Sequence, residues 1–291
     1  LTQRACVLGE AEMEQRGKGP APQAYAMFVL GSGGRGESLL AMDQDNAIVF
    51  GKGNPGSDAD LWFAELGTIV ADTLNDAGVS HCKGGIMASN SEWRMDADHW
   101  RDVVSKWLSK SRPEDILNAD IFFDAKSVHG DDSLLDTLRL DALRAAQNAH
   151  GFLTAMQMRA GEFSSPVGWF GKWKLEDGRV DLKRAGLMPL FSAARVLALR
   201  HGVSEPSTPG RFEAARAAGV EAAHVIDDLI EAHKVLLSAI LRQQLRDIEA
   251  GLKLGNSVDP AQMSGHDLQQ VRWAIDQVPK VRDLLGIPAY V

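Results

Sequence analysis

The sequence predicts an α+β domain, a mixed sheet with flanking helices, over residues 1–139, followed by an all-α domain over residues 140–291. Two observations predict this division. Short apolar runs bounded by glycine clusters, the pattern of buried strands, occur only in the first half. Beyond about Leu140, alanine, leucine and arginine recur at helical spacing. The chain is long enough for two ordinary domains.

The composition is that of a globular protein that neither spans a membrane nor binds nucleic acid nonspecifically. Hydrophobic residues make up 45% and charged residues 24%, which excludes a largely disordered chain. No apolar run is long enough to span a membrane. A formal net charge of −8 argues against nonspecific binding to a phosphate backbone. The two cysteines, Cys6 and Cys82, lie far apart without metal-site spacing, which fits a reducing cytoplasm.

The first elements form a strand, turn and strand. Residues 1–15 read as the end of a helix, and we expect the natural chain to begin further upstream. Residues 25–30 form a short apolar strand, which leads into the glycine-rich turn 31–36. Residues 43–50 end in β-branched and apolar residues before a second glycine cluster, which predicts the next strand. The two strands therefore flank one glycine turn.

Further elements complete the first domain. Apolar residues at helical spacing predict a helix over 58–77. Three tryptophans at intervals of seven predict one helix over 92–108 with these side chains in the core (Trp93, Trp100 and Trp107). Alternation of apolar and acidic residues predicts a strand over 118–128. The second domain is predicted to be helical at four stretches, 141–160, 187–201, 222–252 and 267–285, with one irregular segment at 164–186.

Three acids are the candidate catalytic and metal-binding residues. Asp43 and Asp45 are two residues apart on a predicted strand, so both side chains lie on one face. Carboxylates that converge in this way are the ligands magnesium prefers, and a pair of ions is typical of phosphoryl-transfer sites. Asp124 lies between bulky apolar residues, where an acid needs a partner to offset its burial. We therefore expect Asp124 to complete the site.

The glycine turn is the candidate phosphate site. A strand that runs into Gly31-Ser-Gly-Gly-Arg35-Gly and then a helix start offers backbone N–H groups, a hydroxyl and a guanidinium within one turn. These groups suit the β- and γ-phosphates of a nucleotide, held beside the metal pair.

These motifs resemble a known family. Gly31-Ser32 with Arg35, followed by Asp43-x-Asp45, resembles the polymerase-β-like nucleotidyltransferase superfamily and, within it, the branch related to protein-PII uridylyltransferase. Segments that begin at Cys82, Phe122 and Asp181 are similar to the nucleotidyltransferase family DUF294 with its C-terminal substrate-binding domain. The resemblance covers most of residues 20–285.

The resemblance implies a fold, a reaction and site roles. Asp43 and Asp45 would bind two Mg²⁺ ions, and Asp124 would bind the catalytic ion and help to deprotonate the acceptor. Ser32, with the Gly31 and Gly33 amides, would hold the triphosphate. The reaction would transfer a nucleoside monophosphate from a nucleoside triphosphate to an unknown protein or small-molecule acceptor.

The resemblance also implies phosphate contacts from the helical domain and regulatory domains elsewhere in the whole protein. Lys183 and Arg184, in the irregular segment, would contact the phosphates from the helical domain. Related proteins place CBS or cyclic-nucleotide-binding regulatory domains before the nucleotidyltransferase unit, so the whole protein would act in signal transduction.

Other interpretations fit less of the sequence. Gly31-x-Gly33-x-x-Gly36 also satisfies the dinucleotide fingerprint, but too few residues separate it from the next strand for a parallel crossover. His266-Asp267 suggests a metal phosphohydrolase, yet Ser264-x-x-Asp267 is better interpreted as a helix-capping pair. A catalytically silent nucleotide-sensing or partner-binding module stays open. The three acids favour an enzyme, because a sensor has no need of metal-bridging carboxylates.

Overall fold

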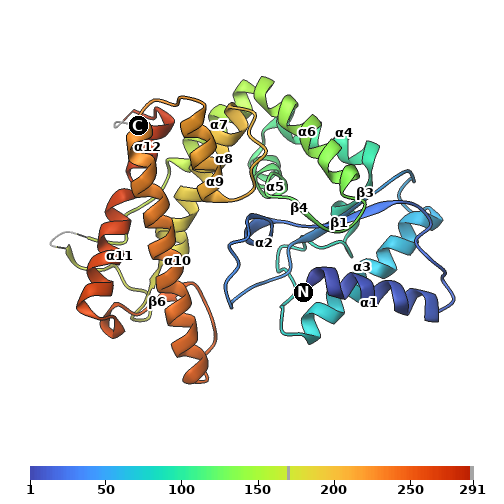
Figure 1. The fold of residues 1–291 in the computed structure, drawn as a ribbon, viewed down its shortest axis with the longest axis horizontal. Coiled ribbons are helices and arrows are strands. Elements are labelled where there is room, and N and C mark those ends of the chain that lie inside the picture. The colour runs from blue at the N-terminus through green and yellow to red at the C-terminus, as the bar shows by residue number, and fades with distance from the viewer. Residues whose placement is uncertain (169–170, 289–291) are drawn as a thin grey trace. The chain divides into compact units, whose positions relative to one another are not determined.

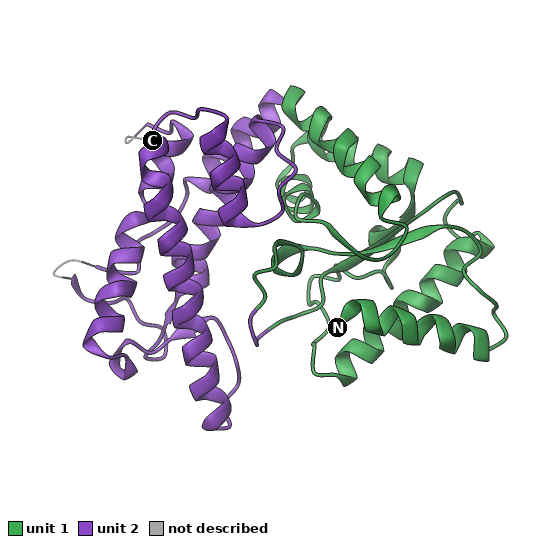
Figure 2. Ribbon diagram, viewed as in Figure 1, with its two compact units in different colours: residues 1–38, 42–148 green, residues 39–41, 149–291 purple. Residues whose placement is uncertain are grey.

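A computed structural model of the chain describes residues 1–168 and 171–288, which form two units (Figure 2). Unit 1 comprises residues 1–38 and 42–148, and unit 2 comprises residues 39–41 and 149–291. The sequence placed the division between 139 and 140, a position inside the continuous helix α6 (Asp132–Asn148). In the described residues, no helix is both long and apolar enough to cross a membrane.

Unit 1 is built on a four-stranded mixed sheet, as expected (Figure 1). Its strands lie in the order β3-β2-β1-β4, with bounds β1 (Tyr25–Val29), β2 (Asn46–Phe50), β3 (Arg94–Asp96) and β4 (Lys126–Gly130). β2 pairs antiparallel with β1 and parallel with β3. The strands on either side of the glycine turn are therefore antiparallel, which excludes the parallel crossover of a dinucleotide-binding fold.

Helices cover both faces of this sheet. Alternate residues of β1 point to opposite faces, so Met27 packs with α1 and α3, while Phe28 packs against Trp100 of α4. In Figure 1, α1 and α3 lie along one face, and α4 and α6 along the other. The bounds are α1 (Thr2–Gln15), α2 (Gly31–Arg35), α3 (Asp58–Asp76), α4 (Ala97–Lys110), α5 (Pro113–Phe122) and α6 (Asp132–Asn148).

Two sequence predictions in this unit are wrong in part. The helix predicted over 92–108 is a 3-10 turn (Ser91–Trp93), strand β3 and helix α4. Its three tryptophans are nevertheless all buried and in ring contact, as predicted. The strand predicted over 118–128 is helix α5 up to Phe122, and β4 begins only at Lys126. Pro113 at the first helical position and Glu114 in the first turn favour the helix.

Unit 2 is helical, with one small ladder that the sequence did not predict. Two-residue strands β5 (Val180–Asp181) and β6 (Ser257–Val258) pair antiparallel. A π-helical turn (Lys183–Leu187) then runs into α8 without a break. The helices are α7 (His150–Ala160), α8 (Met188–Arg200), α9 (Thr208–Ala217), α10 (Ile226–Glu249), α11 (Gly265–Gln277) and α12 (Lys280–Leu285), with 3-10 turns at Ala223–Val225 and Pro260–Gln262.

Ser264 caps α11 as the sequence predicted. Its hydroxyl accepts a hydrogen bond from the Asp267 backbone N–H at 3.1 Å and donates one to the Asp267 carboxylate at 2.8 Å. Asp267 therefore stabilises the start of a helix, and among the described residues His266 belongs to no cluster of three or more metal-binding side chains.

Candidate functional site

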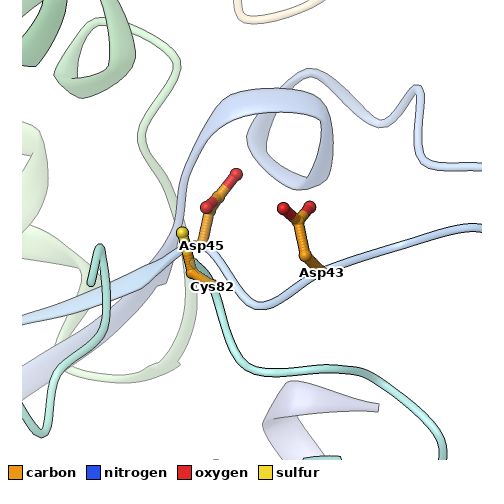
Figure 3. A group of neighbouring side chains, drawn as sticks. All are labelled: Asp43, Asp45 and Cys82. Carbon is orange, nitrogen blue, oxygen red and sulfur yellow. The ribbon is translucent and has the colours of Figure 1, made fainter. Parts of the chain in front are cut away.

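Asp43 and Asp45 lie on an extended segment that enters β2. The strand itself begins at Asn46, but Asp43 already forms a parallel bridge with Ser80. Between the two acids, buried Gln44 donates hydrogen bonds to the carbonyls of Ala71 and Val79, at 2.8 and 2.9 Å. Because Gln44 points into the protein, the extended backbone turns both flanking carboxylates to the other side. Figure 3 shows the two side chains projecting from the chain in the same direction.

A second segment, residues 80–88, runs beside these acids and brings Cys82 to them. The Gln44 N–H donates to the Ser80 carbonyl at 2.9 Å, and the Asn46 N–H donates to the Ile86 carbonyl at 3.1 Å. The Asn46 side chain in turn accepts from the Ala88 N–H at 2.9 Å. These bonds fix the loop at both ends and leave Cys82 beside Asp45 (Figure 3).

Asp43, Asp45 and Cys82 form the candidate metal centre. One ligand atom from each of them lies within 4.8 Å of the others. Burial, and then the hydrogen bond with the Asp45 carboxylate, raises the pKa of the Cys82 thiol. The two carboxylates supply the hard oxygen donors that a divalent cation requires, so the residues present fit a metal-dependent site. The sequence predicted the two acids but gave Cys82 no role, because the hydrogen bonds that place it join residues far apart in the chain.

The glycine turn adjoins this centre. It forms the short helix α2, and the Leu30 N–H immediately before it donates to the Asp45 carbonyl at 2.9 Å. Gly31 has φ +51°, and a Cβ there would lie 2.9 Å from the Asp45 Oδ2. Glycine is thus required at this position both by the backbone angle and by the carboxylate. The first N–H groups of a helix have no partner within it, and Gly31, where α2 begins, lies next to the Asp45 carboxylate.

Asp124 lies in the turn between α5 and β4, where its backbone contacts α2. Its carbonyl oxygen would be 1.8 Å from a Cβ on Gly34, so only glycine allows α2 to approach it. The Asp124 carboxylate is fully buried and forms an ion pair with Arg35. Arg35, itself buried, also bonds Glu37 at 2.9 Å. The partner that the burial of Asp124 demands is therefore Arg35.

The predicted site residues thus fall into separate groups. Asp43 and Asp45 lie together, with Asp45 next to Gly31, and Ser32 and Gly33 follow in the same short helix of unit 1. Asp124 does not belong to the metal-ligand cluster found among the described residues. The role of Asp124 as a third metal ligand and that of Arg35 as a phosphate ligand stay predictions.

The remaining two predicted residues lie in unit 2. Lys183 is half-buried and Arg184 is exposed, and both belong to the π-helical turn rather than to an irregular loop. The Asp181 carboxylate accepts a hydrogen bond from the Arg184 backbone N–H at 2.9 Å and so caps this turn. π-helical turns are rare and occur frequently at functional sites.

Unit 2 also holds a cavity of about 220 Å³ between α10 and α11. Its lining is mixed in charge: Lys234 contacts Glu231 at 3.4 Å, and Arg242 pairs with Asp267. Arg246 also lines it. A polar cavity of this kind is suited to a charged or hydrogen-bonding ligand.

Two family models match the chain. The model described as "Putative nucleotidyltransferase DUF294" matches residues 1–114, which contain the acid pair and the glycine turn. The model described as "Putative nucleotidyltransferase substrate binding domain" matches residues 150–287, which contain Lys183 and Arg184. The chain belongs to the DUF294 nucleotidyltransferase family. None of the curated proteins compared with the chain matches it.

Membership of DUF294 gives the acid pair a chemical context. Nucleotidyltransferases use a nucleoside triphosphate and generally a divalent metal ion, and the Asp43–Asp45 centre offers the donors for that ion. Asp124 falls between the two matched ranges, 1–114 and 150–287.

Proposed function

We propose that the chain is a magnesium-dependent nucleotidyltransferase that moves a nucleoside monophosphate from a nucleoside triphosphate to an acceptor hydroxyl. One observation carries the proposal: the Asp45 carboxylate lies next to Gly31, where α2 begins, and the Asp43 carboxylate lies within the same cluster of metal-binding groups. The carboxylates that would bind a cation and the backbone N–H groups that would bind phosphate oxygens therefore belong to one strand-turn-strand unit.

The reaction divides among these groups. The acceptor oxygen forms a bond to the α-phosphorus, the bond from that phosphorus to the bridging oxygen breaks, and pyrophosphate leaves with the electron pair. Asp43 and Asp45 would hold two Mg²⁺ ions, which supply charge neutralisation when bound. The Gly31 and Gly33 amides and the Ser32 hydroxyl would orient the triphosphate, and positioning of this kind supplies much of the rate.

Asp124 is the proposed third metal ligand and the acceptor of the hydroxyl proton. In the structure its carboxylate is bonded to Arg35, so either role requires this ion pair to open. Arg35, once released, would be able to bind a phosphate oxygen, and its guanidinium suits that geometry. A triphosphate that takes Arg35 would thus free Asp124.

The finer assignment follows from the resemblance to protein-PII uridylyltransferase. We propose UMP transfer to a tyrosine hydroxyl of a partner protein, within a signal-transduction protein that carries CBS or cyclic-nucleotide-binding regulatory domains. Lys183 and Arg184 would contribute phosphate contacts from the substrate-binding domain. The alternative is a catalytically silent nucleotide sensor, favoured by the ion pair that engages the Asp124 carboxylate with Arg35.

The decisive experiment measures label incorporation from each α-labelled nucleoside triphosphate, with Mg²⁺, into proteins of a cell extract. Asp43→Asn/Asp45→Asn keeps side-chain volume but removes the charge that holds the metal, so transfer is expected to fall on the order of 10³-fold or more. Asp72→Asn/Asp76→Asn is the matched control, because these two exposed acids of α3 give the same change in charge. It should transfer as the wild type does.

Equal incorporation by the wild type and the Asp43→Asn/Asp45→Asn variant would refute the mechanism. Magnesium-dependent nucleotide binding in calorimetry, with no label transferred to any acceptor offered, would support the sensor instead. Label found only with α-labelled UTP would support the uridylyltransferase assignment.

A further inference from the structure

We propose that Cys82 is a ligand of the divalent cation at the Asp43–Asp45 centre, and that this thiol makes the centre prefer a borderline ion, Co²⁺ or Zn²⁺, over Mg²⁺. The inference rests on the proposed function only in that it uses the same two carboxylates. The preference is one of affinity: Mg²⁺, bound through the two carboxylates, stays the ion of the proposed transfer reaction, and the thiol adds affinity only for a borderline ion.

The geometry places the sulfur where a ligand would be. The Cys82 Sγ and one oxygen each of Asp43 and Asp45 all lie within 4.8 Å of one another. In a tetrahedral site with metal–oxygen bonds of about 2.1 Å and metal–sulfur bonds of about 2.3 Å, the donor atoms are about 3.5 Å apart. Small side-chain adjustments therefore suffice to bring all three donors to one ion.

The backbone around Cys82 keeps the sulfur in this position. The loop is fixed by the hydrogen bonds from Gln44 to Ser80 and from Asn46 to Ile86, one on each side of Cys82. The side chain is 9% exposed and faces the Asp45 carboxylate, so it cannot swing freely into solvent. A ligand held in place before the metal arrives loses little conformational entropy on binding.

The chemistry of the donor set decides the ion. Magnesium takes hard oxygen ligands in octahedral geometry and gains nothing from a thiol. Co²⁺ and Zn²⁺ accept oxygen and sulfur together and bind thiolate strongly. Binding releases the thiol proton to solvent, since the metal ligand is the thiolate, and no oxidation or reduction takes place.

The test uses the full chain, freed of metal and titrated with Co²⁺, because a thiolate–Co²⁺ bond gives a charge-transfer absorption band. Cys6→Ser is the matched control, since Cys6 is the other buried thiol and lies on α1 in the core. The wild type and Cys6→Ser should show the band, saturating with the bound ion, and should release about one proton from the thiol. Cys82→Ser should lack the band and bind Co²⁺ and Zn²⁺ on the order of 10- to 100-fold more weakly, with Mg²⁺ affinity nearly unchanged.

A second measurement needs no variant. Alkylation of the wild-type chain, read at each cysteine by mass spectrometry, should be slowed by Zn²⁺ at Cys82 and unaffected by Zn²⁺ at Cys6, whereas Mg²⁺ should protect neither. Absence of the band in the wild type, a band that persists in Cys82→Ser, or equal protection by Mg²⁺ and Zn²⁺ would overturn the inference. The transfer assay stays a separate readout: loss of nucleotidyl transfer with the band intact would refute the proposed function alone.

Discussion

Two groups of carboxylates contact the glycine turn, and they differ in the groups that lie beside the acids. In the first group, Arg35 bonds both Asp124 and Glu37, and all three side chains are buried. In the second group, Asp43 and Asp45 lie next to the Cys82 thiol, and Asp43 is exposed. A guanidinium from the chain thus completes the first group during folding, whereas the second group has the donor set of a site that receives its cation from solution.

Unit 2 also contains a buried acid that is paired with an arginine. Buried Asp247 accepts two hydrogen bonds from Arg179, each 2.7 Å long. A buried acid in this protein is therefore not by itself a functional residue. A candidate metal ligand is distinguished by other metal-binding side chains next to it at an accessible position, and burial alone does not distinguish it.

The largest effect is expected from removal of Arg35. Arg35→Met leaves two buried carboxylates, Asp124 and Glu37, without their guanidinium, which should lower the free energy of unfolding by about 3–5 kcal/mol. Urea denaturation followed by circular dichroism would measure this. Arg101→Met is the control, because Arg101 pairs with Asp98 on the exposed surface of α4 and should cost about 0.5 kcal/mol or less. Similar losses for both variants would show that burial of the Arg35 group carries no special weight.

The next effect concerns the close approach of α2 to Asp124. Gly34→Ala would place a Cβ 1.8 Å from the Asp124 carbonyl oxygen, and since the obstacle is backbone, α2 has to shift. A loss of about 1–3 kcal/mol in the free energy of unfolding is expected. In Gly33→Ala the nearest atom, the Val29 Cβ, is 3.5 Å away, so stability should be unchanged or slightly higher. Equal stability of the two variants would contradict the close contact between Gly34 of α2 and the Asp124 carbonyl.

The comparison also shows which features could be predicted from the sequence. The glycine turn, the strands beside it and the pairing of Asp43 with Asp45 depend on residues close together in the chain, and local patterns predict them. Cys82 could not be assigned in this way. Its place beside Asp45 depends on hydrogen bonds between two segments, 43–46 and 80–88, that only the tertiary fold brings together.

Asp124 shows a second limit of the sequence. Its burial predicts a partner, and Arg35 is that partner. The alternation of apolar and acidic residues over 118–128 predicts a strand, yet this segment is helix α5 up to Phe122. The spacing of Ile116, Ala119 and Phe122 also places apolar side chains on one face of a helix, so the pattern does not separate the two structures. The sequence holds no signal that separates a metal from Arg35 as the partner.

A smaller, pH-dependent effect is expected at the buried acid of unit 2. The hydrogen bonds from Arg179 hold the pKa of Asp247 below its usual value of 3.8. An acid whose pKa is lowered by folding stabilises the protein fully above the unfolded-state pKa, and this stabilisation is lost as the pH falls through the folded-state pKa. The wild type should therefore lose stability below about pH 4, whereas Asp247→Asn, already weaker at pH 7, should lose less over the same interval. Parallel pH profiles in urea denaturation would contradict this.

The smallest effect is expected from the cations of the π-helical turn, and it tests whether unit 2 contributes to the nucleotide site at all. Lys183 and Arg184 are not buried, so Lys183→Gln/Arg184→Gln should leave the free energy of unfolding within about 0.5 kcal/mol of the wild type. If these side chains contact the triphosphate, the KM for the nucleotide should rise about three- to tenfold, which corresponds to about 1 kcal/mol, with kcat changed less. Lys110→Gln/Lys253→Gln removes the same charge at two exposed positions and controls for a long-range effect of net charge. Because long-range attraction weakens with salt while a direct contact is screened less, the difference between the two variants should persist at high ionic strength. A KM that rises equally in both variants, or in neither, would remove Lys183 and Arg184 from the site and leave phosphate binding to unit 1, where Gly31 lies beside Asp45.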